Sequence, residues 1–361
     1  MSFQATKREI GEIYTFFSLL AEGRVASGTP DLSAAAPAYK PIALIEREEH
    51  DGTRRYYVEK DDVRVSGASG EVHFPRTDFA EAAGLLLALL RQPGEEVEVP
   101  DVLENFLDAV RIYDLEAKTD DRTDLRIAFW HPQAPLAGYV VRCRLAPMNP
   151  LLDGGRTANL KFEQTGVKFA VPTVNKINAS PEGPAEVAER MRLLERLGGV
   201  LKYNDVADRV FRCNLLMIDL HFPRLLAEMV RLMHLEDITR ISELTERMCD
   251  INPLKIKDEL IRKHGFYPYK VKQFLLALAL GMRPAKIYTG QASAIDGMLL
   301  TDSDGRVYSY DRSAPDVFAE FLYRHTRLEK GPLEKDKYGF LERENGVWYF
   351  KLNAKIGFTK R

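Results

Sequence analysis

The sequence predicts an α+β protein with a helix-rich C-terminal half. Paired strand-like runs separated by turn residues occupy much of the first half, whereas helical apolar spacings dominate residues 185–280. Short strand-like runs return near the C-terminal end. The 361 residues, 45% apolar and 29% charged, have the composition of an ordinary soluble globular chain of about two domains. We expect an N-terminal part over residues 1–180 and a helix-rich part over residues 181–361.

The first half begins with an amphipathic helix. Apolar residues recur at three- and four-residue steps over residues 6–21, and Glu9 and Glu12 share a helix face beside that apolar stripe. Farther along, the pair Asp51-Gly52 is typical of a turn between two antiparallel strands. The other elements expected in this half are strands over 41–49, 54–65, 124–130 and 138–145 and helices over 78–90 and 102–113.

The second half is predicted to be mainly helical. Residues 147–183 contain Pro, Asn and Gly throughout and predict only a short strand near 167–171. Helices are then expected over 185–197, 214–233, 238–249, 255–263 and 269–280. Terminal strands are expected over 298–300, 306–310, 338–342 and 347–352.

Composition and charge exclude several classes of protein. The formal net charge of −2 argues against indiscriminate coating of nucleic acid, although a locally basic groove remains compatible with it. Three cysteines without a CxxC pair favour a reducing compartment, and charged residues where a secretory signal needs its apolar core favour the cytoplasm. The apolar runs are too short to span a bilayer, so no membrane association is expected.

Common cofactor motifs are also missing. The histidines and cysteines show no zinc-binding spacing, and the sequence has no phosphate-binding loop of the P-loop or dinucleotide type. Nucleotide cofactors are therefore not expected. A serine hydrolase elbow is absent as well.

A weaker constellation of carboxylates suggests metal chemistry. Asp124 opens a predicted strand, a hairpin loop follows, and the next strand carries Arg142, while Glu9 and Glu12 lie on the first helix. Carboxylates at neighbouring strand ends can hold Mg²⁺, which activates water and neutralises phosphate charge during phosphodiester cleavage. A nearby cation can stabilise the transition state. The alternative is that Asp124 is an ordinary residue capping the start of a strand.

Several segments resemble the HpaII family of type II restriction endonucleases. They occur in the family's order and together cover nearly the whole chain. The segments are REIGEIYTFFSLLAEGRV at 8–25, CNLLMIDLHFPRLLAEMV at 213–230, ISELTERM at 241–248, YKVKQFLLALALGMRPAKIY at 269–288 and YGFLERENGVWYFKLNAKIGF at 338–358.

This resemblance implies a nuclease core of the PD-(D/E)XK type within residues 1–180, a mixed β-sheet flanked by helices. It also implies Mg²⁺ as cofactor and double-stranded DNA as substrate, with the palindrome CCGG as target. A cognate DNA methyltransferase is expected in the same system without direct contact. A palindromic target is compatible with a homodimer or with successive cuts by a monomer.

The resemblance also implies site residues. The family's metal-binding aspartate matches Asp124, and the opening helix makes Glu12 and Glu9 candidates for metal contact. In the second core strand the chain departs from the family, because Val140 stands in place of a small polar or acidic residue and Arg142 in place of lysine. Arg142 retains the positive charge but exchanges a proton less readily than lysine. A DNA-binding homologue with weak or no cleavage is therefore the alternative.

Basic residues are the expected DNA contacts. Arg144 and Lys161 are candidates for reading guanine in the major groove. The segment 254–286 is rich in bases, and four of its lysines are candidates for contacts to the phosphate backbone. They are Lys255, Lys257, Lys270 and Lys272. For all six residues an ordinary solvated surface cation is the alternative.

Overall fold

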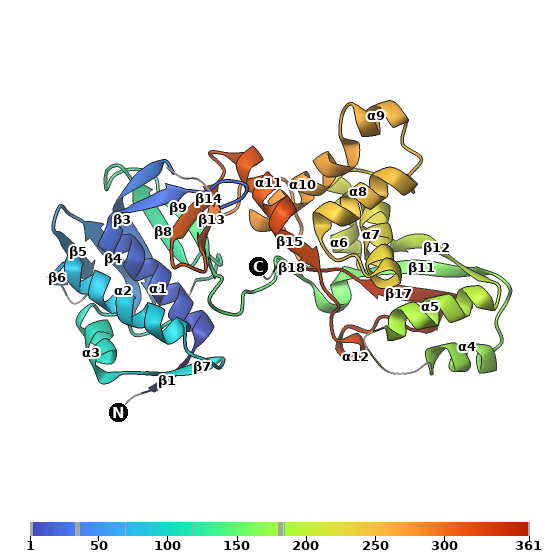
Figure 1. Ribbon diagram of the computed structural model, residues 1–361, viewed down its shortest axis with the longest axis horizontal. Coiled ribbons are helices and arrows are strands. Elements are labelled where there is room, and N and C mark those ends of the chain that lie inside the picture. Colours follow the sequence, from blue (N-terminus) through green and yellow to red (C-terminus); the bar gives the residue numbers. More distant parts are fainter. Residues whose placement is uncertain are drawn as a thin grey trace.

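The computed structural model describes residues 3–32, 37–68, 70–117, 119–179, 183 and 185–359. Its largest sheet has nine strands, and helices lie on both sides of it (Figure 1). The strands are β2 (Arg24–Ser27), β14 (Val307–Asp311), β13 (Gly297–Thr301), β9 (Ala137–Cys143), β8 (Leu125–Phe129), β3 (Tyr39–Glu49), β4 (Gly52–Val58), β5 (Asp62–Gly67) and β6 (Gly70–Pro75), in spatial order. Because β13 runs parallel to β9 and β14 parallel to β2 while the other pairs are antiparallel, the sheet is mixed. This confirms the expected α+β class.

Helix α1 (Lys7–Glu22) packs against the middle of this sheet. It begins at a capping box, in which the Thr6 hydroxyl accepts from the Glu9 amide and the Glu9 carboxylate accepts from Thr6. It ends at Gly23, whose φ of 60° is a left-handed conformation that glycine adopts without strain. At Gly11 a Cβ would lie 2.9 Å from Cβ of Cys143 in β9, so glycine permits the close approach of helix and strand. Further elements of this part are α2 (Arg76–Leu90), α3 (Asp101–Ala109), β1 (Phe3–Thr6) and β7 (Glu96–Val99).

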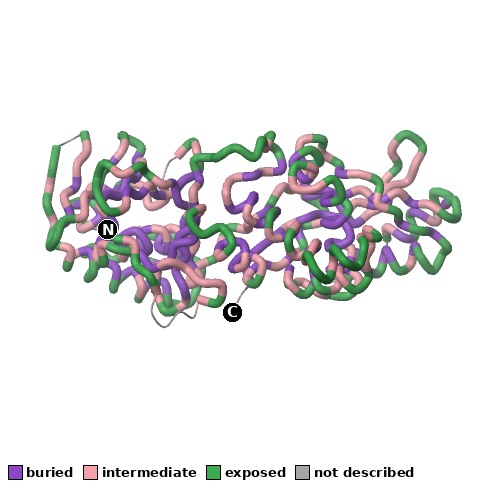
Figure 2. The backbone as a smooth tube through the Cα atoms, turned by 90° about the horizontal axis from the view of Figure 1, so that it is seen from above, coloured by how far each residue is buried: buried purple, intermediate pink, exposed green. Residues whose placement is uncertain are grey.

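The sheet separates two hydrophobic cores. Alternate residues of β13 point to opposite faces, so that Leu299 belongs to the core under α1 while Met298 and Leu300 belong to the core of the helix-rich part. On that second face α11 (Pro315–His325) packs against β14, with α10 (Phe266–Ala279) beside α11 (Figure 1). Figure 2 shows buried segments in both parts of the molecule.

The helix-rich part also contains smaller sheets. In one, β12 (Gly199–Val206), β11 (Asn159–Gly166), β17 (Val347–Asn353) and β16 (Leu341–Glu344) are neighbours, and in the other β10 (Leu152–Asp153), β18 (Lys355–Phe358) and β15 (Thr326–Leu328) are neighbours. Its remaining helices are α4 (Val171–Asn178), α5 (Glu186–Arg196), α6 (Arg209–Ile218), α7 (Phe222–Glu236), α8 (Ile241–Ile251), α9 (Asp258–Arg262) and α12 (Leu333–Asp336), with a short 3₁₀ turn at Gly155–Ala158. Among the described helices, none has the length and apolar character needed to cross a membrane.

The chain crosses between the two parts on both sides of residue 180. Strand β11, before that residue, pairs with β12 and β17 of the smaller sheet, whereas β13 and β14, far beyond it, complete the nine-stranded sheet. The expected division into residues 1–180 and 181–361 therefore does not coincide with the sheets.

Some expected elements differ in the structure, each for a local reason. The single strand expected over 54–65 is two strands, because a turn in which the Glu59 amide donates to the Asp62 carbonyl separates β4 from β5. The helix expected over 214–233 is interrupted, because the Asp219 carboxylate accepts from the His221 amide between α6 and α7. The prediction of a short strand near 167–171 was wrong. Strand β11 ends earlier, at Gly166, and the chain then enters α4 with a proline in its first turn.

Candidate active site

A cavity of about 610 Å³ lies where the nine-stranded sheet meets the helix-rich part. Strand β9, helix α1 and the loop before β8 contribute side chains from one part of the chain, and the end of α10 contributes from the other. Val140 lies on its wall among the charged residues Arg8, Glu12, Glu116, Arg122, Asp124, Arg142, Asp153 and Arg283. The structure therefore brings together Glu12, Asp124 and Arg142, which the sequence had placed on three separate elements.

Asp124 is held at the start of β8 by hydrogen bonds to β9. Its amide donates to the Tyr139 carbonyl at 2.8 Å, and its Oδ2 accepts from the Val141 amide at 2.6 Å. The preceding loop is stabilised by the Thr123 hydroxyl, which donates to Asp121 at 2.6 Å. Because the second strand fixes one carboxylate oxygen, the orientation of the Asp124 side chain depends on the hairpin itself.

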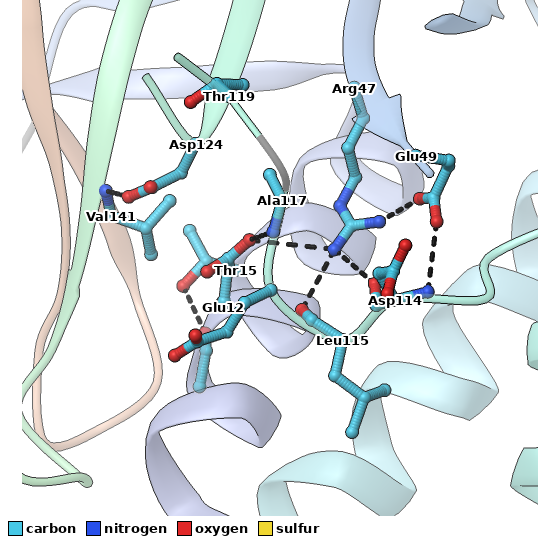
Figure 3. A network of polar contacts seen from close by, with 12 residues as sticks. Glu12, Thr15, Arg47, Glu49, Asp114, Leu115, Ala117, Thr119, Asp124 and Val141 are labelled. Atoms are coloured by element: carbon cyan, nitrogen blue, oxygen red, sulfur yellow. Dashed lines mark hydrogen bonds and ion pairs between the residues drawn. The ribbon is translucent and has the colours of Figure 1, made fainter. Parts of the chain in front are cut away.

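Glu12 reaches the same cavity from α1, immediately after the glycine that contacts β9. Its Oε1 accepts from the Ala117 amide at 2.8 Å and lies 3.6 Å from Nη2 of Arg47 (Figure 3). Its side chain is 11% exposed. A backbone donor and a buried guanidinium thus hold this carboxylate beside the loop that precedes Asp124.

The two carboxyl groups perturb each other electrostatically. Burial, and secondarily the nearby Asp124 carboxylate, raise the pKa of Glu12 to about 8. Burial likewise raises the pKa of Asp124, against the opposing effects of the Val141 amide and of Arg142. Two buried acids that resist ionisation together favour the binding of a cation between them.

Mg²⁺ is compatible with this donor set. Within the described part of the chain, no three His, Cys, Asp or Glu side chains converge as a complete metal site. Mg²⁺ does not require such a site, because it commonly binds through one or two carboxylates and takes its other ligands from water and substrate phosphate. Glu12 and Asp124 supply two carboxylates on one cavity wall.

A buried ion pair between Arg47 and Glu49 stabilises the loop that binds Glu12. Arg47, 1% exposed, pairs with Glu49, and its Nη2 donates to the carbonyls of Asp114 at 2.6 Å and Leu115 at 2.9 Å (Figure 3). The Glu49 carboxylate accepts in turn from the amide of Asp114 at 3.0 Å. The pair therefore fixes the loop whose Ala117 amide binds Glu12.

Sequence reasoning did not identify Arg47, although a signal was present. In β3 the buried residues Ile45, Arg47 and Glu49 alternate, which places both charges on the apolar face of the strand. Charges of opposite sign at inward positions indicate a buried pair. The run of charged residues at 46–49 conceals that alternation.

Arg142 and Val140 lie on the same face of β9 and both line the cavity. The Arg142 Nη1 donates to the Val141 carbonyl at 2.7 Å. Burial lowers the pKa of Arg142, while Asp124 and then Glu12 favour its charged form. Val140 packs partly against the core of the helix-rich part and adds no ligand, as the sequence indicated.

Glu9 is placed apart from these residues. Its carboxylate accepts at 2.7 Å from both the amide and the hydroxyl of Thr6, and it does not line the cavity. The expectation that Glu9 shares the metal site with Glu12 is therefore not supported by its position, because Glu9 caps the first turn of α1.

The two candidates for base reading also lie outside the cavity lining. Arg144 is partly buried, with its Nη2 3.4 Å from Nδ1 of His325. Lys161, on β11, makes an ion pair of 2.6 Å with Glu344. Neither position favours guanine recognition over a structural role.

The four lysines of the basic segment fall into two classes. Lys270 pairs with Asp219 at 2.9 Å and Lys272 with Glu320 at 2.5 Å, which reduces the charge they can offer to DNA. The other two are exposed and make no ion pair within the described residues; they are Lys255 and Lys257.

Comparison with known proteins places this chain in a family. The family model of the HpaII restriction endonuclease matches residues 6–358. The chain belongs to the HpaII restriction endonuclease family. It is 26% identical over 364 residues to the type II restriction enzyme HpaII of Haemophilus parainfluenzae, covering 99% of each chain. No solved structure matches it.

Membership of the HpaII restriction endonuclease family makes the protein a site-specific deoxyribonuclease of type II, acting on double-stranded DNA. The resemblance seen in the separate segments of the sequence is thereby confirmed over nearly the whole chain. Glu12, Asp124 and Arg142 of this enzyme line one cavity.

The raised pKa of Glu12 predicts a pH dependence of stability in this HpaII-family enzyme. A carboxyl whose pKa rises from 4.5 to about 8 on folding contributes stability that is fully present below pH 4.5 and lost as the pH rises through about 8. The melting temperature of the metal-free protein should therefore fall across this window. Glu12→Gln should flatten the fall, because the amide keeps an acceptor for Ala117 and carries no charge.

The matched control is Glu22→Gln on the exposed end of the same helix, where the side chain is 61% exposed. This variant should retain the wild-type pH dependence. Equal slopes of melting temperature against pH for wild type and Glu12→Gln would show that Glu12 does not titrate in this range.

Proposed function

We propose that this enzyme is an Mg²⁺-dependent endonuclease of the PD-(D/E)XK type that hydrolyses double-stranded DNA at CCGG. The observation that carries the metal and the fold type is the convergence of Glu12, Asp124 and Arg142 on one cavity at the β8–β9 hairpin of a mixed sheet. The target CCGG rests on the family resemblance. The identity of 26% to the HpaII enzyme supports that target without fixing it.

Glu12 and Asp124 would hold the metal. When bound, Mg²⁺ lowers the pKa of an attacking water and neutralises charge on the phosphate. The chain's own residues orient the carboxylates, since the Ala117 amide fixes Glu12 and the Val141 amide fixes Asp124. This leaves the second oxygen of each carboxylate for other contacts.

Arg142 supplies the positive charge of the site. It lies on the strand that also fixes Asp124, and both acids favour its charged form. A guanidinium is a poor proton donor at neutral pH, so we assign Arg142 to electrostatic stabilisation of the charge that develops on the phosphate and not to proton transfer.

Backbone contacts to DNA are proposed for Lys255 and Lys257. Both are exposed next to α9 and without an ion pair in the described residues. Phosphate contacts of this kind add affinity without sequence preference.

The test is cleavage of a supercoiled plasmid that contains CCGG. We expect Mg²⁺-dependent cutting at that site and none after chelation. A plasmid without CCGG should remain intact, and methylation of the site by a cognate DNA methyltransferase should protect it. Cutting at another sequence would disprove the target while leaving the nuclease assignment in place.

A second candidate is a DNA-binding homologue with weak or no cleavage. The observation that favours it is Val140, which lines the cavity and packs against apolar residues. The family resemblance implies a small polar or acidic residue at this position. Tight binding to CCGG duplexes with no nicking at any Mg²⁺ concentration would establish this candidate.

A further inference from the structure

The helix-rich part contributes one cation to the cavity, and its surroundings indicate that it is positioned for a ligand. Arg283 follows α10 and lines the cavity together with Asp124 and Arg142, which come from the nine-stranded sheet and its loop. It is partly buried. None of the predicted metal or DNA contacts includes this residue.

A buried amide holds the turn that carries Arg283. Asn214 on α6 is 1% exposed, and its Nδ2 donates to the carbonyls of Arg283 and Lys286, each at 2.8 Å. Its Oδ1 accepts from the Tyr288 amide at 2.9 Å. A buried polar side chain that uses its donors and its acceptor on one turn fixes the backbone there.

The guanidinium itself is only partly satisfied by protein. Its Nη1 donates to the carbonyls of Leu278 at 3.2 Å and Met282 at 3.0 Å, at the end of α10. Within the described residues Arg283 makes no ion pair, and its Nε and Nη2 find no acceptor. Two donors in a planar fork are therefore left for a ligand.

The neighbouring charges favour an anion. Arg122 and Arg142 line the same cavity, and after burial they are the causes that lower the pKa of Arg283. Another cation of the wall, Arg8, is already paired with Glu116. Arg122, Arg142 and Arg283 repel one another beside the acids Glu12 and Asp124. An anion with two oxygens that each accept a hydrogen bond would fit among these arginines.

We propose that Arg283 binds a phosphate of the DNA backbone, so that the helix-rich part contacts the strand lying in the cavity of the carboxylates. The inference rests on the proposed function in one respect, namely that duplex DNA enters this cavity. Bidentate geometry suits a guanidinium and two phosphate oxygens. Arg283 is then a substrate-binding residue. It positions the DNA from the helix-rich part, whereas Asp124 lies at the nine-stranded sheet.

The test is the salt dependence of DNA binding, measured in Ca²⁺ with a duplex containing CCGG and with a scrambled duplex. Arg283→Gln should weaken binding to both duplexes by about tenfold. It should also reduce the slope of log affinity against log salt by about 0.9, the value for one lost phosphate contact. Arg283→Lys should retain the wild-type slope, because the charge remains.

The matched control is Arg196→Ala, an exposed arginine at the end of α5 that does not line the cavity. It should leave both affinity and slope unchanged. If Arg283 only caps α10, the Gln and Lys variants should lower the melting temperature alike and keep the wild-type slope, and that result would overturn the proposal.

A second measurement covers the case in which Arg283→Gln does not fold. Arg283→Lys keeps the charge but lacks the fork, so it should lose several-fold affinity for natural DNA. That loss should vanish when the contacted phosphate is replaced by a neutral methylphosphonate. A loss of equal size at every substituted position overturns the proposal. Failure of the proposed target is seen separately, as equal affinity of the wild type for the CCGG and scrambled duplexes.

Discussion

Asp124→Ala should abolish cleavage of CCGG plasmid in Mg²⁺ while duplex binding in Ca²⁺, or without metal, stays within a few fold of the wild type. Loss of the carboxylate removes one of the two acids that we propose hold the metal, and a carboxylate near phosphate opposes DNA binding when no metal is present. The burial that raises the pKa of Asp124 shows how costly its ionised form is without a cation. The measurement is the single-turnover cleavage rate beside the duplex dissociation constant.

Two further variants separate chemistry from folding. Asp124→Asn keeps an oxygen that can accept from the Val141 amide, so the hairpin should remain intact while cleavage is lost. Asp120→Ala changes an exposed aspartate of the same loop and should cut like the wild type. Unchanged cleavage by well-folded Asp124→Ala would remove this residue from the site.

The first helix and the β8–β9 hairpin could be predicted because their signals are local. The apolar spacing of 6–21 and the turn residues between 130 and 138 depend on neighbours in the sequence. α1 (Lys7–Glu22) agrees with its prediction to within about one residue at each end. The proximity of Glu12 to Asp124 then followed from the family resemblance, which supplied the missing long-range contact.

What could not be predicted depends on pairing between distant segments. Strands β13 and β14 were expected as short terminal strands, but no local signal shows that β13 lies beside β9 in parallel. That pairing brings the helix-rich part onto the second face of the sheet. Arg283 lines the cavity only because of this arrangement. No local signal in the sequence therefore distinguishes it from the exposed lysines of the same basic segment.

Arg142→Ala should lower the cleavage rate by about a hundredfold or more with little change in DNA affinity, the usual scale for loss of one transition-state charge contact. Arg142→Lys should keep or raise activity, because lysine is the residue that the family resemblance implies at this position. Removal of the guanidinium should also raise the pKa values of Asp124 and Glu12 further, since Arg142 favours the ionised form of Asp124. The rate of the Ala variant should therefore recover partly as the pH increases, and the Lys variant should return the profile to that of the wild type.

Arg55→Ala is the control for these measurements, because Arg55 lies in the same sheet, pairs with Glu46 at 2.6 Å and is 54% exposed away from the cavity lining. It should cut like the wild type.

Combining Val140→Glu with Arg142→Lys should raise metal affinity, because a carboxylate on the cavity face of β9 adds a third acid beside Glu12 and Asp124. An Arg142→Ala protein that cuts normally in Mg²⁺ would show that another cation serves the phosphate. Arg283 would then be the first candidate, since it already lines the same cavity without an acidic partner in the described residues.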